Sequence, residues 1–228
     1  MVMEKIIFFT GAGISAESGL PTFRDSDGLW MGYDINEVAT PEAWRKNRNL
    51  VQEFYNMRRR DALKAQPNQA HQLIASLEDN FRVTVITQNI DDLHERAGST
   101  RVVHLHGEIF KMKSDRDGST LYDIKEDIPF GARAKDGGYL RPHVVWFGEA
   151  VPEMESAMQL VQDADIFVVV GSSLQVYPAA GLAHSLSFGV RRFLIDRNPP
   201  PSAVDYGFEV IAKKATEGMA DLVDLLEG

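Results

Sequence analysis

The sequence has no cysteine among its 228 residues. This absence excludes disulfides, a thiol nucleophile and thiolate ligands for a metal. Long apolar stretches are also missing, since no run approaches the roughly 20 residues that a membrane-spanning helix needs. The amino-terminal segment shows no basic stretch followed by an apolar core and a cleavage site. We therefore expect a soluble, cytoplasmic protein with no membrane partner.

Positive charge is scarce as well, because 24 lysines and arginines stand against 33 aspartates and glutamates, a formal net charge of -9. Such a charge opposes long-range attraction to nucleic acid, so no nucleic-acid partner is expected. No coiled-coil pattern is present, and we predict a monomer. Apolar sequence is abundant: 44% hydrophobic residues suffice for one large domain with a small inserted module.

Short apolar runs, rich in β-branched and aromatic residues, alternate along the chain with segments of helical periodicity. The apolar runs span residues 6–9, 83–86, 102–105, 166–170, 193–195 and 208–211. The helical segments span residues 41–63, 71–78, 91–97, 153–163, 179–188 and 216–226, with Gly98 and Gly189 at expected C-caps. This alternation predicts an α/β fold whose parallel sheet is buried on both faces. The irregular region 111–140 is expected to be an insertion outside that sheet.

The stretch GAGISAESGLPTFR, residues 11–24, directly follows the first apolar run. Gly11, Gly13 and Ala16 match G-x-G-x-x-G/A, a pattern whose small residues allow a tight turn and a close backbone approach to phosphate. The first amides of a following helix would complete a pyrophosphate site. An ordinary glycine turn is the alternative. A hydride-transferring enzyme is disfavoured, because a polar loop follows instead of a second strand ending in an acid.

Polar side chains also follow other predicted strands, at the edge where doubly wound sheets bind ligands. Gln88, Asn89 and Asp91 suit hydrogen bonds to ribose hydroxyls or a carboxamide, although Asp91 could simply cap a helix. The segment Gly171–Ser173 could cradle phosphate or ribose, or form only a turn.

Two histidines, His104 and His106, stand two residues apart at the end of a predicted strand and share one face. This spacing is compatible with a metal site or with a general base. A metal is disfavoured because no third ligand is evident nearby. The alternative, an ordinary histidine at a strand end, applies better to His104 than to His106.

The motifs GAGISAESGLPTFR, TQNIDDLHERAG, HLHGEIF, RPHVVWFGE and GSSLQVYPA, in this order, resemble the sirtuins, the NAD-dependent protein lysine deacylases. The resemblance covers about residues 4–227. It implies a Rossmann-like doubly wound parallel sheet, a small inserted module and a helical lid; the lack of cysteines makes the predicted module zinc-less. It also implies a single catalytic domain, residues 1–228, with small-module insertions at about 31–70, which is helical, and 109–141.

The resemblance implies NAD as cofactor and acyl-lysine proteins as substrates, with nicotinamide and O-acyl-ADP-ribose among the products. His106 would be the general base, because a neutral imidazole can accept a ribose hydroxyl proton at pH 7, and Asn89 would be catalytic too. The residues implied to bind NAD are Gly11, Ala12, Gly13, Ser15, Glu17, Phe23, Arg24, Gln88, Asn89, Ile90, Asp91, Gly171, Ser172, Ser173, Asn198 and Ala215. The residues implied to bind the acyl-lysine peptide, in part by strand addition, are Tyr55, Arg58, Val145, Phe147, Gly148 and Glu149.

Tyr55 and Arg58 are three residues apart in a predicted helix and therefore project from one face. A guanidinium beside a phenol suits a carboxylate. The pair falls where class III sirtuins recognise succinyl, malonyl or glutaryl lysine, and RPHVVWFGE is similar to that class. The resemblance thus implies a desuccinylase and demalonylase with possible deacetylase activity. Alternatively, residues 58–60 are a solvated charge run and Tyr55 is a packing residue.

Sirtuins usually carry four cysteines that hold a zinc in the small module, and here residues 111–138 contain none. We therefore predict no zinc, and a module held together by packing. Its expected packing residues are Ile109, Leu121, Tyr122, Ile124 and Ile128.

Two other functions use the same predicted pocket. A mono-ADP-ribosyltransferase would pass ADP-ribose to a protein side chain. A non-catalytic module would only sense NAD or ADP-ribose, and the presence of His106 and of the peptide-binding segment 145–149 argues against it.

Overall fold

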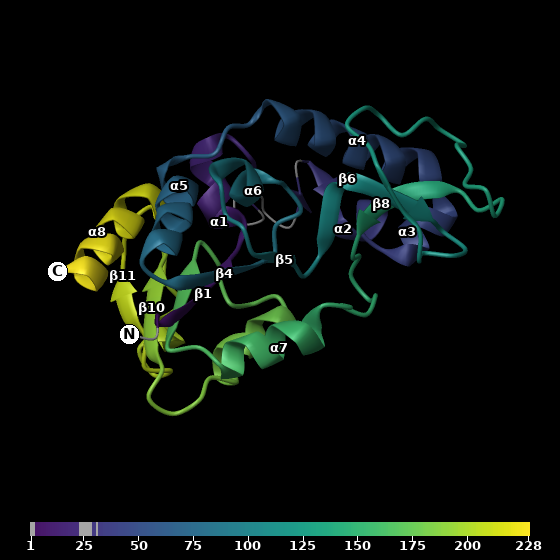
Figure 1. Ribbon diagram of the computed structural model, residues 1–228. Helices are drawn as coiled ribbons and strands as arrows, with labels where there is room; N and C mark the ends of the chain where they lie inside the picture. Colours follow the sequence, from purple (N-terminus) through teal and green to yellow (C-terminus); the bar gives the residue numbers. More distant parts are fainter. Residues whose placement is uncertain (1–2, 23–28, 31) are drawn as a thin grey trace.

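The computed structural model describes residues 3–22, 29–30 and 32–228. Its centre is a parallel sheet with the order β11-β10-β9-β1-β4-β5 (Figure 1). The strands are β1 (Lys5–Thr10), β4 (Arg82–Thr87), β5 (Val102–His104), β9 (Ile166–Val170), β10 (Arg191–Ile195) and β11 (Glu209–Ile211). This arrangement confirms the predicted α/β, doubly wound fold. The chain reverses its direction of growth between β1 and β9, and doubly wound sheets bind their ligands beyond the carboxyl ends of the strands at that point.

Helices cover both faces of the sheet, which explains why its strands read as continuous apolar runs. On one face, α5 (Gln69–Ser76) and α8 (Ala215–Glu227) pack Ile74 and Met219 against Ile6 and Phe8. On the other, α7 (Met154–Gln162) and the 3-10 helix η3 (Ala179–His184) cover Ile7 and Phe9. Figure 1 shows α8 and α5 on one side of the strands and α7 on the opposite side.

Several predicted helices differ from those observed. The segment 41–63 forms two helices, α3 (Pro41–Lys46) and α4 (Arg48–Lys64), because Asn47 leaves the helical conformation and its Oδ1 accepts the Leu50 amide. Gly98 has φ +110 and ends α6 (Leu93–Ala97) as predicted, whereas Gly189 lies beyond the end of η3 and caps no helix. The remaining elements are α1 (Ala12–Ser15), η1 (Ala16–Ser18), β2 (Leu29–Trp30), β3 (Tyr33–Asp34), α2 (Ile35–Val38), η2 (Leu77–Asp79) and η4 (Pro201–Ala203).

The region predicted to be irregular lies outside the parallel sheet but forms a small antiparallel sheet of its own, with the order β7-β6-β8. Its strands are β6 (Gly107–Ser114), β7 (Leu121–Asp123) and β8 (Leu140–Val144). Ile109 packs with residues of α2, α3 and α4 in a third apolar core, and Ile128 is fully buried. The prediction for Leu121 is wrong, because that side chain is 41% exposed.

A search of the described residues for membrane spans found no helix of sufficient length and apolar character.

Candidate active site

Two glycine turns meet at the switch point of the sheet. Gly11–Gly13 follows β1 and Gly171–Ser173 follows β9, and the Gly13 amide donates a 2.9 Å hydrogen bond to the Gly171 carbonyl. A Cβ on Gly13 would lie 2.6 Å from the Gly171 Cα, and a Cβ on Gly171, which has φ +63, would lie 2.4 Å from the Ile14 nitrogen. Glycine is therefore required at both positions because the two turns touch each other.

The helix predicted after the first glycine turn is short. Helix α1 has four residues and passes directly into η1. A ligand at the glycine turn would therefore bind the turn itself and its hydroxyl side chains more than the end of a long helix. Glu17 accepts hydrogen bonds from the amide (3.1 Å) and hydroxyl (3.0 Å) of Thr216, and so ties this turn to the start of α8 beside Ala215. Phe23 and Arg24 lie outside the described residues.

A buried hydrogen-bond network joins the first turn to the segment after β4. The Asn89 side-chain amide donates to the Gly11 carbonyl (3.1 Å) and to the Ser15 hydroxyl (3.2 Å). The Ser15 hydroxyl in turn lies 3.2 Å from Asp91, where burial raises the carboxyl pKa. Asp91 also accepts the Leu93 amide (3.2 Å), but the N-cap residue of α6 is Asp92, so the interpretation of Asp91 as a helix cap is wrong. These contacts fix Asn89 in one orientation.

His106 is held in a defined protonation state. Its Nδ1 lies 3.0 Å from the Gln88 carbonyl oxygen, which can only accept a hydrogen bond, so Nδ1 carries the proton and Nε2 has the free lone pair. Burial lowers the pKa of His106 below its usual value, which keeps the ring neutral at pH 7. The Gln88 side chain donates to the Ser172 hydroxyl (2.9 Å) and so links the second glycine turn to the turn behind His106. His106 therefore presents a neutral base at Nε2.

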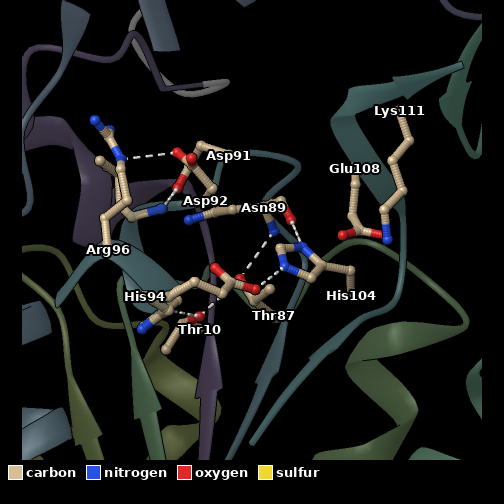
Figure 2. Close-up of polar contacts among 12 residues, drawn as sticks. Thr10, Thr87, Asn89, Asp91, Asp92, His94, Arg96, His104, Glu108 and Lys111 are labelled. Atoms are coloured by element: carbon tan, nitrogen blue, oxygen red, sulfur yellow. Dashed lines mark hydrogen bonds and ion pairs between the residues drawn. The ribbon is translucent and has the colours of Figure 1, made fainter. Parts of the chain in front are cut away.

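His104 makes the parallel contact one residue further along. Its Nδ1 lies 2.9 Å from the Asn89 carbonyl (Figure 2). Its Nε2 lies 2.7 Å from Glu95. The two histidines thus hold successive backbone carbonyls of one turn, which is the physical reason for their spacing. Among the described residues, no cluster of three or more histidine and acidic side chains could hold a metal ion.

Tyr55 and Arg58 of α4 lie beside the segment that follows β8. Tyr55 is 2% exposed and its ring centroid lies 6.5 Å from that of Trp146. The Arg58 guanidinium lies 5.9 Å from the Tyr55 ring, and burial lowers its pKa to about 10, so it stays cationic at pH 7. The negative charge of Asp91 opposes this lowering of the Arg58 pKa.

The alternative interpretation of residues 58–60 as a solvated charge run is wrong for Arg59. The alternative interpretation of Tyr55 as a packing residue is confirmed, because Tyr55 packs in the third apolar core. Arg59 is fully buried and donates from Nε to the Ile109 carbonyl at 2.8 Å. Arg60, by contrast, is partly exposed and pairs with Glu53 at 2.8 Å. The three arginines therefore have three different environments, which their sequence could not separate.

The segment 144–149 runs next to His106. The Val145 amide donates to the His106 carbonyl (2.9 Å), and Phe147 is 45% exposed beside Gly148, which has φ +87. Glu149 binds Arg141 (2.7 Å) and the Trp146 amide (2.8 Å). The Glu149 carboxylate thus shapes this segment from within. Ile90 connects the turn after β4 to β6, because the Ile90 carbonyl accepts the Ile109 amide (2.8 Å).

Two further predicted residues, Ser173 and Asn198, lie after β9 and β10 at the same edge of the sheet. The Asn198 amide donates to Asp196 at 2.8 Å. Ser172 is 5% exposed, in keeping with its contact to Gln88.

Sequence analysis missed Thr10 and Thr87, which end neighbouring strands in the same register. Their hydroxyls lie 2.8 Å apart, and the Thr87 hydroxyl accepts the Asn89 amide at 3.0 Å. The sequence pattern that could have identified them is a threonine directly after each of two apolar runs, 6–9 and 83–86. Glu95 was missed as well, and its position in a polar helix offered no signal.

Hydrogen bonds hold the stretch where the resemblance would place a zinc. The Ser114 hydroxyl lies 2.7 Å from Asp136, which also accepts the Gly138 amide at 2.9 Å. A hydroxyl and one carboxylate that are already bonded to each other do not fit the tetrahedral thiolate site of a structural zinc.

We expect chelation with EDTA to leave the melting temperature unchanged, because the bonds to Asp136 do not depend on a metal. The variant Asp136→Ala should lower the melting temperature by a few degrees, whereas Asp205→Ala, at an exposed position, should not. Differential scanning fluorimetry measures both. A large drop on chelation, restored by zinc, would contradict this account.

Comparison with known proteins gives consistent matches. Residues 11–178 match the model of the Sir2 family. A protein from Bacteroides thetaiotaomicron named NAD-dependent protein deacylase is 50% identical, over 98% of each chain. The crystal structure of a Sir2 homolog–NAD complex superposes with a TM-score of 0.88 at 38% identity, covering 99% of this chain and 90% of that one. A Sir2 structure with a deacetylated peptide and 3'-O-acetyl ADP ribose gives 0.80 at 30% identity, covering 97% and 93%.

Proposed function

Because this chain belongs to the Sir2 family, we propose that it is an NAD-dependent protein lysine deacylase that favours succinyl and malonyl groups and also removes acetyl groups. The observation that carries this proposal is the contact of His106 Nδ1 with the Gln88 carbonyl, which leaves Nε2 as a neutral base. That base lies beside the switch point of the sheet, where a dinucleotide would bind.

The donor set at the switch point fits NAD. Two glycine turns bring main-chain groups together, and the hydroxyls of Ser15 and Ser172 are held within the network around Asn89 and Gln88. Pyrophosphate and ribose need this combination of amide and hydroxyl donors. When bound, NAD would supply an electrophilic sugar carbon with nicotinamide as the leaving group.

The chain's own residues would then orient the reactants and move one proton. Asn89 is fixed by its contacts to Gly11 and Ser15, so it can position a ribose hydroxyl without reorganising. His106 would accept the proton of that hydroxyl at Nε2. The exposed Phe147 and the turn at Gly148 would flank the entering lysine and exclude water.

The acidic acyl preference rests on Arg58 and Tyr55. Arg58, on α4, is cationic and largely buried. A carboxylate on the acyl chain would meet its positive charge in a poorly solvated environment. Burial raises the pKa of Tyr55 to about 12, so its hydroxyl stays protonated and can donate to the same carboxylate.

The test incubates the purified protein with NAD and matched acetyl-, succinyl- and malonyl-lysine peptides, following peptide mass and released nicotinamide. Faster loss of the acidic groups is the expected result. Faster loss of acetyl would discard the acyl preference alone. ADP-ribose attached to protein, or NAD binding without turnover, would replace the proposal with the transferase or the sensor.

A further inference from the structure

His104 is half-buried beside the turn that carries Asn89, and both of its ring nitrogens face acceptors. Nδ1 lies 2.9 Å from the Asn89 carbonyl oxygen, and Nε2 lies 2.7 Å from a Glu95 carboxylate oxygen. Neither partner has a proton to donate when Glu95 is ionised. A neutral imidazole carries one N–H and can satisfy only one of them. Both contacts form together only when His104 is an imidazolium.

The neighbouring charges agree with this state. Burial by itself would lower the pKa of His104, but the hydrogen bond and charge of Glu95 and the Asn89 carbonyl outweigh it, and the net pKa is raised. The pKa of Glu95 is lowered, since the same contact outweighs its burial. The other titratable groups around His104, among the described residues, are Asp91, Asp92, His94, Glu108, Lys111, Asp123 and Lys125.

Glu108 and Lys111 form their own pair at 2.8 Å on β6, and Asp92 pairs with Arg96 at 2.9 Å. Figure 2 shows His104 between Asn89 on one side and the Glu108–Lys111 pair on the other. Burial lowers the pKa of His94 well below its usual value, so that ring stays neutral. Among the described residues, Glu95 is therefore the one acidic group that is hydrogen-bonded to His104.

We propose that His104 is a positioning residue that works as an imidazolium. It bridges the Asn89 carbonyl and the Glu95 carboxylate and thereby fixes the position of the turn that carries Gln88 and Asn89. The proposal deepens the proposed function and rests on it, because this turn orients both Asn89 and the carbonyl that fixes the His106 tautomer. His104 itself touches no reacting atom.

The sign of the pH dependence follows from a raised folded pKa. The imidazolium contact is lost as the pH rises through the folded pKa, and the stability that it contributes is fully present only below the unfolded pKa of about 6.5. His106 acts in the opposite sense, because it must be neutral to accept a proton and its pKa is lowered. We therefore expect a bell-shaped profile of kcat, with His106 on the acidic limb and His104 on the alkaline limb.

The test compares the wild-type protein with Glu95→Gln. A glutamine can turn its amide so that its NH2 donates to Nε2, which lets a neutral His104 keep its Nδ1–H on the Asn89 carbonyl. In the variant, the His104 titration midpoint, followed by NMR of ¹⁵N-labelled histidine, should fall by about one pH unit or more. The alkaline limb of kcat should leave its wild-type position. In a second variant, His104→Gln, no imidazole is present at this position, so the alkaline limb at the wild-type position should be absent as well.

The carbonyl resonance of Asn89 provides a readout that needs no turnover, and in the wild type it should titrate with the His104 ring. The matched control is Glu78→Gln, which removes another carboxylate that accepts a backbone amide, from Thr100 at 2.8 Å. That variant should keep the wild-type limb. A wild-type His104 midpoint below 6.5, an Asn89 resonance that ignores the ring, or an alkaline limb unchanged in Glu95→Gln would each overturn the proposal. Absence of turnover in the wild type would overturn the proposed function, while the NMR titrations would still decide the role of His104.

Discussion

Replacing His106 by alanine is expected to lower deacylation by about a hundredfold to ten-thousandfold, the usual contribution of a general base. The physical reason is that His106 Nε2 is the neutral base at this site, fixed there by the contact of Nδ1 with the Gln88 carbonyl. The measurement is kcat for the preferred acyl peptide, together with NAD affinity by isothermal titration calorimetry. NAD affinity should change little, because the glycine turns and the Asn89 network are formed without the imidazole.

The matched control for this variant is His184→Ala. His184 is an exposed histidine whose ring packs 4.3 Å from that of Tyr206, away from the turn after β4. We expect near wild-type turnover from it. Full activity of His106→Ala would contradict the assignment of His106 as the general base. A large loss of NAD affinity would indicate that His106 is a binding residue instead.

The second large effect is expected at the acyl pocket. Arg58→Met should lower kcat/KM for succinyl-lysine peptide by about tenfold to a hundredfold, since a hydrogen bond to a charged group contributes about 1.5–3 kcal/mol. Deacetylation should fall much less, because an acetyl group offers no carboxylate to the guanidinium. Methionine keeps the length and apolar stem of the side chain against Tyr55, so the helix should retain its packing.

Arg60→Met is the matched control on the same helix, since Arg60 is partly exposed and pairs with Glu53. It should leave the ratio of desuccinylation to deacetylation unchanged. Equal losses on both substrates in Arg58→Met would refute a selective role for Arg58, and the deacylase proposal would stand without its acyl preference.

The sequence was sufficient to predict the parallel sheet, because the strands of that sheet are buried on both faces and therefore form continuous apolar runs. Continuous apolar runs such as 166–170 have no other stable place in a chain of this length, and every residue of that run is buried. It was less sufficient for the helices. The division of 41–63 at Asn47 depends on one side chain capping the next helix, and the alternative of a continuous helix has the same periodicity.

The small module shows the same limit from another side. Its residues lack both an apolar alternation of useful length and cysteine ligands for a metal, so the sequence predicted only an irregular insertion. Its antiparallel sheet follows from pairing between strands far apart in the chain, Lys113 with Arg141 and Lys111 with Asp123. Such pairings are selected by tertiary contacts and leave little local signal.

The amino-acid sequence by itself determined the fold class, the order of the motifs and the chemistry of each candidate residue, because local patterning and residue type follow directly from the chain. Only the tertiary structure decided how those residues act. The glycines of the first motif are required by the second glycine turn, and His104 and His106 divide into a cation and a neutral base because they meet different partners, Glu95 in one case and only the Gln88 carbonyl in the other. Those partners belong to other elements of the fold, and protonation state depends on burial and neighbouring charge, which no local sequence pattern contains.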